Sequence, residues 1–259
     1  MSFEQPTALF LFAHQDDEFG VFQKIIDEQR IGRRVFCAYL TAGVFEGKSP
    51  LRRNRESLAV LKQLRVQEED IFFAGHRLSI PDGGLPDHLD SAIEWIEDWF
   101  AGCQRVAAIY LPAWEGGHHD HDALHAIGVI LAEKTGRLKV MRQFPLYNGY
   151  QCAGPFFRVL LPLPMNGPRE VIKMTFANRL RFLRYCLSYR SQMSSWIGLF
   201  PFVLLHYIFF GTQTLQAVSL ERIQHRPHAG PLYYETRSFY SWEKMFERLM
   251  VFDSPGTEQ

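Results

Sequence analysis

The sequence lacks a secretory signal and a long apolar run. Its N-terminus has no basic region or small-residue cleavage site, and the apolar stretch at 8–13 is too short for a signal-peptide core. The one membrane-like segment, 196–210, falls short of the ~20 residues that a spanning helix needs and contains Pro201 and His206. We therefore expect a cytoplasmic protein without a transmembrane span. We expect a buried or subunit-interface helix here; the alternative is an interfacial surface, peripheral to a membrane, that meets lipid or a lipid-linked substrate.

Cysteine is scarce, and neither sign of charge is in excess. The four cysteines are far apart with no CxxC pair, which favours free thiols in a reducing compartment. The 28 basic and 28 acidic residues balance, so no long-range field points to nucleic acid or an anionic membrane surface. No GxGxxG follows the first strand, and neither GxxxxGK[ST] nor GxSxG occurs. Nucleotide binding and a serine nucleophile are therefore unsupported.

Apolar runs alternate with helical patterns over the first 150 residues. Strands are predicted at 8–13, 34–40, 70–74, 105–111 and 139–147, with helices at 19–30, 51–64, 87–100 and 122–133. This alternation indicates βαβ units and a Rossmann-like, doubly wound α/β fold, with a mostly parallel sheet and helices on both faces. Beyond it, a strand at 156–163 and a helix at 168–189 precede aromatic, irregular sequence. We expect a single domain over 1–259, with its core in 1–150 and a C-terminal aromatic cap in 151–259.

Two of the predicted strands end in clusters of histidine and carboxylate. AHQDDE follows the first strand and contains His14, Asp16 and Asp17, while GGHHDHD follows the fourth and contains His118 and His121. If these strands flank the point where strand order reverses, the clusters face each other across the ligand crevice. Two histidines and one carboxylate, with positions left open, suit a catalytic zinc. We expect His14, Asp17 and His121 to bind the metal.

The same clusters contain candidate acid and base groups. A zinc ion lowers the pKa of its water to about 7, and Asp16, next to a ligand but free itself, is placed to accept the proton. His118 is placed to steady an oxyanion or to protonate a leaving amine. The alternatives are that Asp16 or Asp17 caps a helix and that the histidines lie in a solvated loop. Two such clusters at two strand ends favour a site.

These residues resemble the PIG-L/LmbE family of zinc-dependent N-deacetylases, whose motifs are AHPDDE and HPDH. The corresponding segments are AHQDDE at 13–18 and GGHHDHDAL at 116–124, supported by TAG at 41–43, RNRE at 53–56, PDG at 81–83 and YRSQ at 189–192. The resemblance implies a Rossmann-like fold and hydrolysis of an N-acetyl group from an amino sugar, often N-acetylglucosamine on a larger carrier. The implied cofactor is zinc or another divalent metal.

Matching the motifs residue by residue implies roles for individual side chains. The metal ligands are the three residues expected above, and Asp16 resembles the general base. His118 resembles the acid or oxyanion-stabilising histidine, with Asp120 orienting it. Arg53 and Asp82 match positions that contact sugar hydroxyls; the alternatives are a solvated helix face for Arg53 and a turn former for Asp82.

The sequence departs from the family motifs at three places. Gln15 and His119 replace the two motif prolines, and His119 is an alternative ligand to His121. Gly116 stands where some members have a tyrosine that assists the oxyanion, so that role is vacant or supplied from elsewhere. Trp114 precedes the second cluster, where it either stacks on a sugar or lies in the core.

The expected function is zinc-dependent removal of an N-acetyl or longer N-acyl group from a glucosamine-type sugar conjugate. One alternative keeps the chemistry and changes the substrate to an N-acylated natural product, a glycolipid or a sugar-thiol precursor. The other is a non-catalytic metal or sugar-binding module, against which the unliganded Asp16 argues. The expected partner is a small amino-sugar substrate, with a carrier or lipid attachment left open by the aromatic cap. Relatives are often trimers or hexamers, which permits a homo-oligomer.

Overall fold

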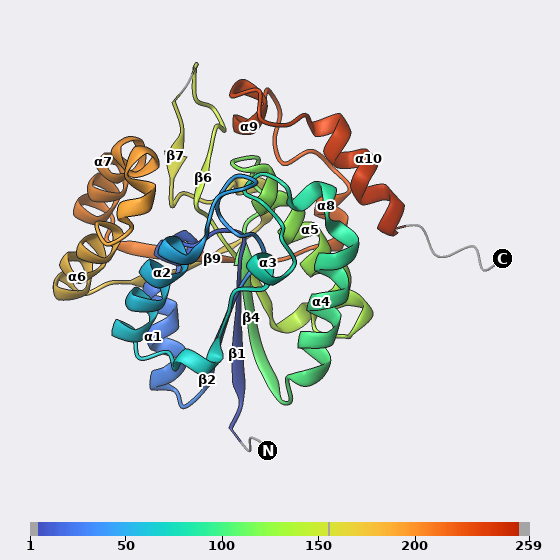
Figure 1. Ribbon diagram of the computed structural model, residues 1–259. Coiled ribbons are helices and arrows are strands. Elements are labelled where there is room, and N and C mark those ends of the chain that lie inside the picture. The colour runs from blue at the N-terminus through green and yellow to red at the C-terminus, as the bar shows by residue number, and fades with distance from the viewer. Residues whose placement is uncertain (1–4, 155, 254–259) are drawn as a thin grey trace.

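A seven-stranded sheet forms the centre of the protein (Figure 1), for which the computed structural model describes residues 5–154 and 156–253. The strand order is β3-β2-β1-β4-β5-β9-β8. These strands are β1 (Thr7–Phe12), β2 (Arg34–Tyr39), β3 (Ile71–Phe72), β4 (Val106–Pro112), β5 (Met141–Phe144), β8 (Arg169–Lys173) and β9 (Thr212–Ala217). Strands β1 to β5 pair in parallel, whereas β9 pairs antiparallel with β5 and β8. The predicted mostly parallel sheet is confirmed.

Helices cover both faces of this sheet, as the doubly wound pattern predicts. Alternate residues of β1 enter two separate cores: Phe10 and Phe12 belong to one, and Leu9 and Leu11 to the other. The first core includes buried residues of α1 (Phe22–Arg30) and α2 (Leu51–Gln63), and the second includes those of α4 (Leu89–Gly102) and α5 (His119–Lys134). Because β1 is buried on both faces, it is continuously apolar.

The C-terminal part of the chain contributes two strands to the sheet and a layer of helices around it. Its elements are β7 (Arg158–Val159), which pairs with β6 (Tyr147–Asn148), and α6 (Phe176–Cys186), α7 (Met193–Phe209), α8 (Leu220–Ile223), α9 (Tyr233–Thr236) and α10 (Trp242–Asp253). The helix predicted at 168–189 was wrong at its start, because 169–173 form β8 and α6 begins only at Phe176. The strand predicted at 156–163 shrinks to the two residues of β7.

One helical segment of the described residues, 190–209, is long and apolar enough to cross a membrane by length and composition. This segment consists of a 3-10 turn and α7. Its Trp196, Val203 and Tyr207 are buried in the same core as α1 and α2. Helix α7 therefore packs along the folded protein in this structure, beside α6 (Figure 1).

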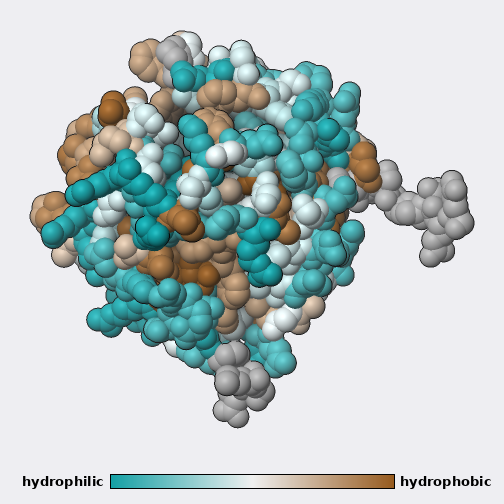
Figure 2. Space-filling model, viewed as in Figure 1, coloured by the Kyte–Doolittle hydropathy of each residue, from teal (hydrophilic) through white to brown (hydrophobic). Residues whose placement is uncertain are grey.

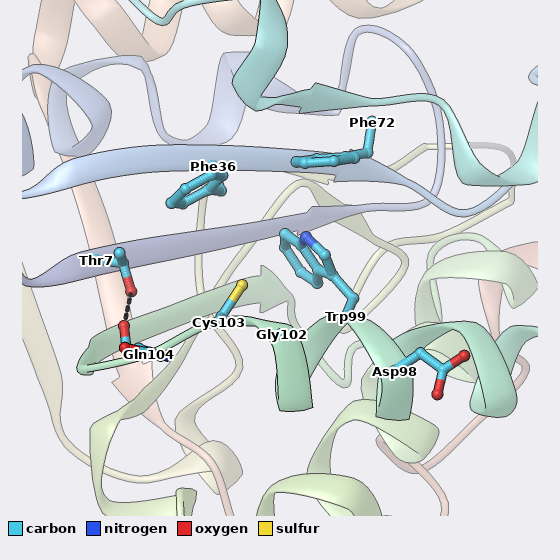
Figure 3. A pocket seen from close by; sticks show the side chains of 8 residues that line it. All are labelled: Thr7, Phe36, Phe72, Asp98, Trp99, Gly102, Cys103 and Gln104. Atoms are coloured by element: carbon cyan, nitrogen blue, oxygen red, sulfur yellow. Dashed lines mark hydrogen bonds between the residues drawn. The ribbon is translucent and has the colours of Figure 1, made fainter. Parts of the chain in front are cut away.

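A cavity of about 290 Å³ lies near the amino end of β1, away from the two histidine clusters. Its walls include Phe36, Phe72 and Trp99, and Thr7 Oγ1 donates a hydrogen bond to the carbonyl of Gln104 at 3.3 Å (Figure 3). No histidine lines it. Open α/β sheets bind ligands at the carboxyl ends of their strands, so a catalytic site is expected at the opposite ends of these strands.

Candidate functional site

The two predicted clusters meet at the carboxyl ends of β1 and β4. These strands are parallel neighbours, and the strand order reverses between them. His14 lies two residues after the end of β1. Helix α5 begins within the second cluster, and His118 is its N-cap residue. A cavity of about 880 Å³ opens beside them, with His118, Asp82 and Tyr147 in its wall.

Three side chains converge on one point with atoms suited to a metal. His121 Nε2 lies 3.2 Å from His14 Nδ1 and 3.0 Å from Asp17 Oδ1. Tetrahedral bonds of about 2.0–2.1 Å place neighbouring ligand atoms about 3.3 Å apart, so the spacing and the donor set fit a divalent cation. The other Asp17 oxygen accepts the backbone N–H groups of Ala13 and His14 at 2.9 and 2.8 Å, which fixes the carboxylate.

Charge supports the same arrangement. Burial alone would raise the pKa of Asp17, but His121 and His14 outweigh it and hold that pKa well below its usual range. Asp17 is therefore a carboxylate. His119, the alternative ligand, points elsewhere: its Nε2 lies 3.0 Å from the carbonyl of Gly83, and its ring stacks on that of Tyr240. The structure thus brings His121, and not His119, to the other two donors.

Asp120 contacts His14, one of the three candidate metal ligands. Its Oδ2 lies 2.9 Å from His14 Nε2, and it also accepts the backbone N–H groups of Gly83 and Leu85 at 2.7 and 3.0 Å. A carboxylate on the outer nitrogen of a ligand histidine fixes its ring and tautomer. The expected partner of Asp120 was His118, whose Nδ1 is 3.9 Å from Asp120 Oδ2. The contact between residues 14 and 120 joins the segments that follow β1 and β4, so neither motif alone predicts it.

His118 is a neutral hydrogen-bond donor toward the pocket. Burial lowers the pKa of this imidazole well below its ordinary value, and the positive charge of His14 acts in the same direction. Its Nδ1 accepts the backbone N–H of Asp120 at 3.1 Å, so the proton of the neutral ring resides on Nε2. That nitrogen lies 3.9 Å from Asp82 Oδ1 at the cavity wall. A neutral ring in this tautomer can donate to an oxyanion.

Asp16 is held in a strained conformation with both carboxylate oxygens engaged. Its φ of 122° lies in the left-handed region that disfavours side chains, and such strain concentrates at functional sites. The Glu18 carboxylate accepts its backbone N–H at 3.0 Å, Arg53 donates to Oδ1 at 3.0 Å, and Trp196 Nε1 donates to Oδ2 at 3.1 Å. Burial raises the pKa of Asp16 to about 6, although Arg53 opposes the shift. Trp196 was predicted only as part of the aromatic cap.

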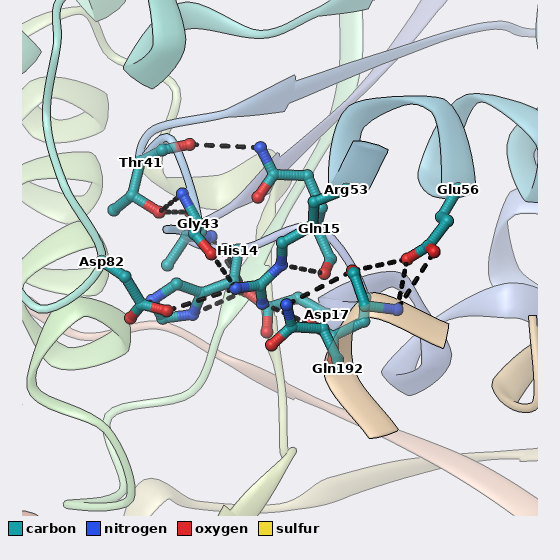
Figure 4. A network of polar contacts seen from close by, with 12 residues as sticks. His14, Gln15, Asp17, Thr41, Gly43, Arg53, Glu56, Asp82 and Gln192 are labelled. Carbon is teal, nitrogen blue, oxygen red and sulfur yellow. Dashed lines mark hydrogen bonds and ion pairs between the residues drawn. The ribbon is translucent and has the colours of Figure 1, made fainter. Parts of the chain in front are cut away.

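Arg53 joins the two loops that carry Asp16 and Asp82, and Figure 4 shows Arg53 with Asp82 and Gly43. It donates to Asp16, to Asp82 Oδ2 at 3.2 Å and to the carbonyls of Gln15 and Gly43. Only 4% of this residue is exposed, so it is not a solvated helix face. Most of its N–H groups already have partners within the protein. Asp82 lies at the cavity wall with Oδ1 3.3 Å from His14 Nε2, where it can meet a ligand.

The departures from the family motifs have structural explanations. Gln15 is fully buried, and its Nε2 donates to Asn54 Oδ1 at 2.7 Å. Gly116 has φ +69°, and a Cβ there would lie 2.6 Å from Leu232, so a tyrosine cannot occupy this position without displacing its neighbour. Tyr147, which reaches the cavity from β6 and lies edge-on to the His121 ring, brings a phenol to the site from another part of the chain.

The loop after β4 contains two fully buried residues, Glu115 and Trp114. Glu115, fully buried, accepts the N–H groups of Leu146 and Tyr147 at 2.7 and 2.9 Å, which positions the start of β6. Trp114 has no exposed surface and donates its Nε1–H to the carbonyl of His225 at 2.9 Å. Sugar stacking by this residue is therefore wrong, because its ring belongs to the core beneath the site and is absent from the cavity wall.

The secondary motifs RNRE and YRSQ contact one another. Glu56 accepts a hydrogen bond from Ser191 Oγ at 2.6 Å and from its N–H at 3.0 Å. The contact fastens the segment before α7 to α2, and Figure 4 shows Glu56 and Gln192 in the same network of polar contacts. The YRSQ segment thus anchors the helix that delivers Trp196 to Asp16.

Comparisons with known proteins agree with this geometry. Residues 9–132 match the model of the PIG-L family, described as GlcNAc-PI de-N-acetylase, while no curated protein sequence matches the chain. Similar solved structures include the A40926 pseudoaglycone deacetylase Dbv21, with 20% identity over 88% of this chain and 100% of that one and a TM-score of 0.60. A deacetylase of teicoplanin biosynthesis has 18% identity over 82% and 98%, with a TM-score of 0.62.

A third similar structure has a lower sequence identity. The N,N'-diacetylchitobiose deacetylase of Pyrococcus horikoshii has 14% identity over 87% of this chain and 88% of its own, with a TM-score of 0.57. At these identities the likeness concerns the fold, while the family rests on the sequence match and on the two motifs that meet at the strand switch. The α/β core over residues 9–132 is a PIG-L domain, the family that the two motifs resemble.

Proposed function

We propose that this protein is a metal-dependent hydrolase that removes an N-acetyl or N-acyl group from a glucosamine-type sugar conjugate. The observation that carries the proposal is that candidate metal ligands and a separate candidate base lie together where the strand order reverses. Three side chains offer donor atoms to a zinc-like ion, while Asp16 stays outside that set with its pKa raised to about 6 by burial. A site that only bound metal would not need a second, strained carboxylate beside the ligands.

The ligand set assigned to the metal is His14, Asp17 and His121. When bound there, a zinc ion or another divalent cation supplies Lewis acidity toward water and the amide oxygen. Asp120 keeps the His14 ring in the tautomer that leaves Nδ1 free for this ligand role. The three donors leave positions for water and substrate.

The chain's other residues then account for the proton transfers. Asp16 accepts a proton from the attacking water; its two hydrogen bonds, from Arg53 and Trp196, leave a lone pair on each oxygen for this purpose. As the carbonyl carbon takes up the water oxygen, charge develops on the amide oxygen, and His118 Nε2–H donates to it. The C–N bond breaks when Asp16 returns its proton to the departing nitrogen. The products are a free amine and a carboxylic acid.

The cavity walls support an amino-sugar substrate. Asp82 and the backbone of Gly83 offer polar contacts, and Arg237 from the loop after α9 adds a cation. Phe157, Leu199 and Phe239 supply apolar and aromatic surface. Sugar rings use this combination, because their hydroxyls need polar partners and their C–H faces pack on aromatic rings. Structures similar to this chain include deacetylases named for A40926 pseudoaglycone and for N,N'-diacetylchitobiose, which supports the substrate class.

The cavity is lined by residues from both the N-terminal core and the C-terminal part of the chain. Helix α7 contributes Ser194, Ser195, Gly198 and Leu199 to the cavity, and Trp196 contacts Asp16. Strands β9 and β8 extend the sheet beyond β5. We therefore propose that 1–259 works as one domain whose C-terminal part completes the site.

The decisive experiment measures release of free amine from a panel of N-acetylglucosamine conjugates, with metal content determined on the same samples. Wild type is compared with Asp16→Asn and with Asp27→Asn, a matched carboxamide on α1. We expect Asp16→Asn to keep its metal and lose at least about 100-fold in turnover, while Asp27→Asn stays near wild type. Because one similar structure is a zinc-inhibited form of teicoplanin deacetylase, zinc is added at one equivalent. Full activity in Asp16→Asn would refute the base assignment.

Acyl length is tested by the same assay with a series of N-acyl glucosamines. Apolar cavity residues around Phe157, which packs on Phe202 with ring centroids 5.0 Å apart, favour turnover of longer acyl groups as well as acetyl. Metal bound without turnover on any substrate would support the binding-module alternative.

A further inference from the structure

We propose that α6 and α7 form a docking surface for a bilayer that contains anionic lipids, and that this surface places the mouth of the cavity at the membrane. The inference goes beyond the proposed function, since binding to lipid can be measured without any substrate. It rests on three independent features of the described residues. These are the distribution of charge, a continuous apolar stripe along α7, and the position of that stripe next to the cavity.

The first feature is a local excess of positive charge in a neutral chain. No acidic residue occurs between Glu170 and Glu221, whereas that stretch contains five basic ones. These are Lys173, Arg179, Arg181, Arg184 and Arg190. All but Arg179 are exposed, and within residues 5–154 and 156–253 none of the five forms an ion pair. Overall neutrality therefore hides a basic surface that is complementary to anionic headgroups.

The second feature is the apolar stripe itself. Met193, Ile197, Leu205 and Ile208 are exposed along α7 at helical spacing, together with Phe209 at its end. Ile197 is 71% exposed and Phe209 74%. Such large side chains are rarely left in water as a contiguous row without a partner. The space-filling view shows apolar surface gathered along the edge where Figure 1 places α6 and α7 (Figure 2).

Helix α6 continues this surface and joins the two features. Its exposed apolar side chains, Phe176 and Leu180, lie one turn apart, and Leu187 follows the helix two turns later. Arg181 and Arg184 border this row on the same exposed side of the helix. Apolar side chains flanked by arginines are the pattern of helices that lie in the interface, with the rings and aliphatic chains inserted and the guanidinium groups among the phosphates.

The third feature is that the cavity-lining residues and the apolar stripe lie on adjacent sides of α7. Ser194, Gly198 and Leu199 line the cavity, while Ile197, between them in sequence, points to solvent. Trp196 faces the core and reaches Asp16. A bilayer against the stripe would thus lie next to the cavity mouth. The contact that anchors α7 to the site also fixes how the protein would sit on the membrane.

The test is co-sedimentation of the full-length protein with vesicles, one set of phosphatidylcholine alone and one of phosphatidylcholine mixed equally with phosphatidylglycerol. We expect sedimentation with the mixed vesicles, weakened by salt. Ile197→Asp combined with Ile208→Asp should reduce the partition coefficient by about tenfold or more. Arg181→Gln combined with Arg184→Gln should reduce binding to the mixed vesicles by roughly 30-fold and change binding to phosphatidylcholine little.

The matched control is Ile31→Asp combined with Val251→Asp, two apolar residues outside α6 and α7 that are 62% and 70% exposed, one just after α1 and the other on α10. It should bind like wild type. Circular dichroism and thermal unfolding of each variant establish that the exposed substitutions leave the fold intact. No binding of folded wild type to mixed vesicles would overturn the proposal, as would equal loss in the control. A dimer in solution that Ile197→Asp with Ile208→Asp dissociates would assign the stripe to a second copy of the chain and also overturn it.

Discussion

Replacing Arg53 by methionine tests the central claim about how the site is built. The side chain donates to two carboxylates, Asp16 and Asp82, and to two backbone carbonyls, and 4% of the residue is exposed. Methionine keeps most of the buried aliphatic volume and removes every one of these hydrogen bonds. Both carboxylates then lose their guanidinium partner, and the loops after β1 and around residue 82 lose their link.

The expected cost follows from the burial of that network. Removing one partner of a buried ion pair destabilises a protein by about 3–5 kcal/mol. The side chains of Asp16 and Asp82 retain 14% and 23% exposure, so water can partly solvate them, and we expect the lower end, about 3 kcal/mol. Activity should fall too. Arg53 lowers the pKa of Asp16, so in the variant this pKa rises above about 6 and the acidic limb of the rate profile moves to higher pH.

Urea unfolding followed by tryptophan fluorescence measures the first effect as a shift in midpoint at constant slope. Arg52→Met is the matched control: it is the neighbouring residue on α2, its side chain is 68% exposed, and it forms an ion pair with Glu56. An exposed pair contributes at most about 1 kcal/mol. Arg53→Lys should recover only part of the loss, because a single ammonium cannot reach both carboxylates with the geometry of a guanidinium. Equal destabilisation by the two methionine variants would refute the reasoning.

Three further changes test other parts of the structure. Gly116→Ala should lower stability by about 1–3 kcal/mol in thermal unfolding, because φ is +69° and the added Cβ meets Leu232; Gly136→Ala, also at positive φ with open space around it, should lose only the conformational part. Asp120→Asn should weaken metal affinity about 10- to 100-fold in a chelator competition, since it orients His14, and unchanged affinity would contradict that role. Glu28 is buried, and although burial raises its pKa, its partners lower it below the usual value. Those partners are Lys24, Tyr110 and Arg33. Its contribution to stability is therefore present above about pH 4.5 and lost as the pH falls through the depressed pKa, so Glu28→Gln should flatten the acid limb of the stability–pH curve; an unchanged limb would count against it.

The core of the fold and the meeting of the two motifs could be predicted from the sequence because their signals are local. A strand buried on both faces is continuously apolar, as β1 is, and the end of such a run marks where polar side chains enter the crevice. Once β1 and β4 are neighbours, His14 and His121 must approach each other. The choice between His119 and His121 was left open by spacing alone. It depends on the first turn of α5, which turns His119 toward Gly83.

Contacts that bridge distant segments gave no local signal. Asp120 was matched to His118 beside it, whereas the structure pairs it with His14, 106 residues earlier. Strand β9 is polar in sequence, TQTLQA, because its buried glutamines bond to backbone: Gln216 Nε2 donates to the carbonyls of Leu163 and Gly167 at 3.0 and 2.7 Å. Binary patterning treats these glutamines as solvated, so a central strand was taken for irregular sequence.

The sequence predicted a buried or subunit-interface helix at 196–210, and α7 forms there, but the exposure of its outer face gave no signal in the sequence. A helix that packs one face on a core and leaves the other in water shows an apolar period of 3.6 residues. In α7 both faces are apolar, so no such period appears: Val203 and Tyr207 are buried in the core, and Ile197 and Ile208 are exposed. Core packing explains the first face, and it explains nothing about the second. The apolar exposed face has a physical cause only if something other than water covers it in the working protein, and the arginines beside it favour a membrane with anionic lipids. Since Trp196 on the same helix contacts Asp16, a ligand of that outer face would act on the helix that also completes the catalytic cavity.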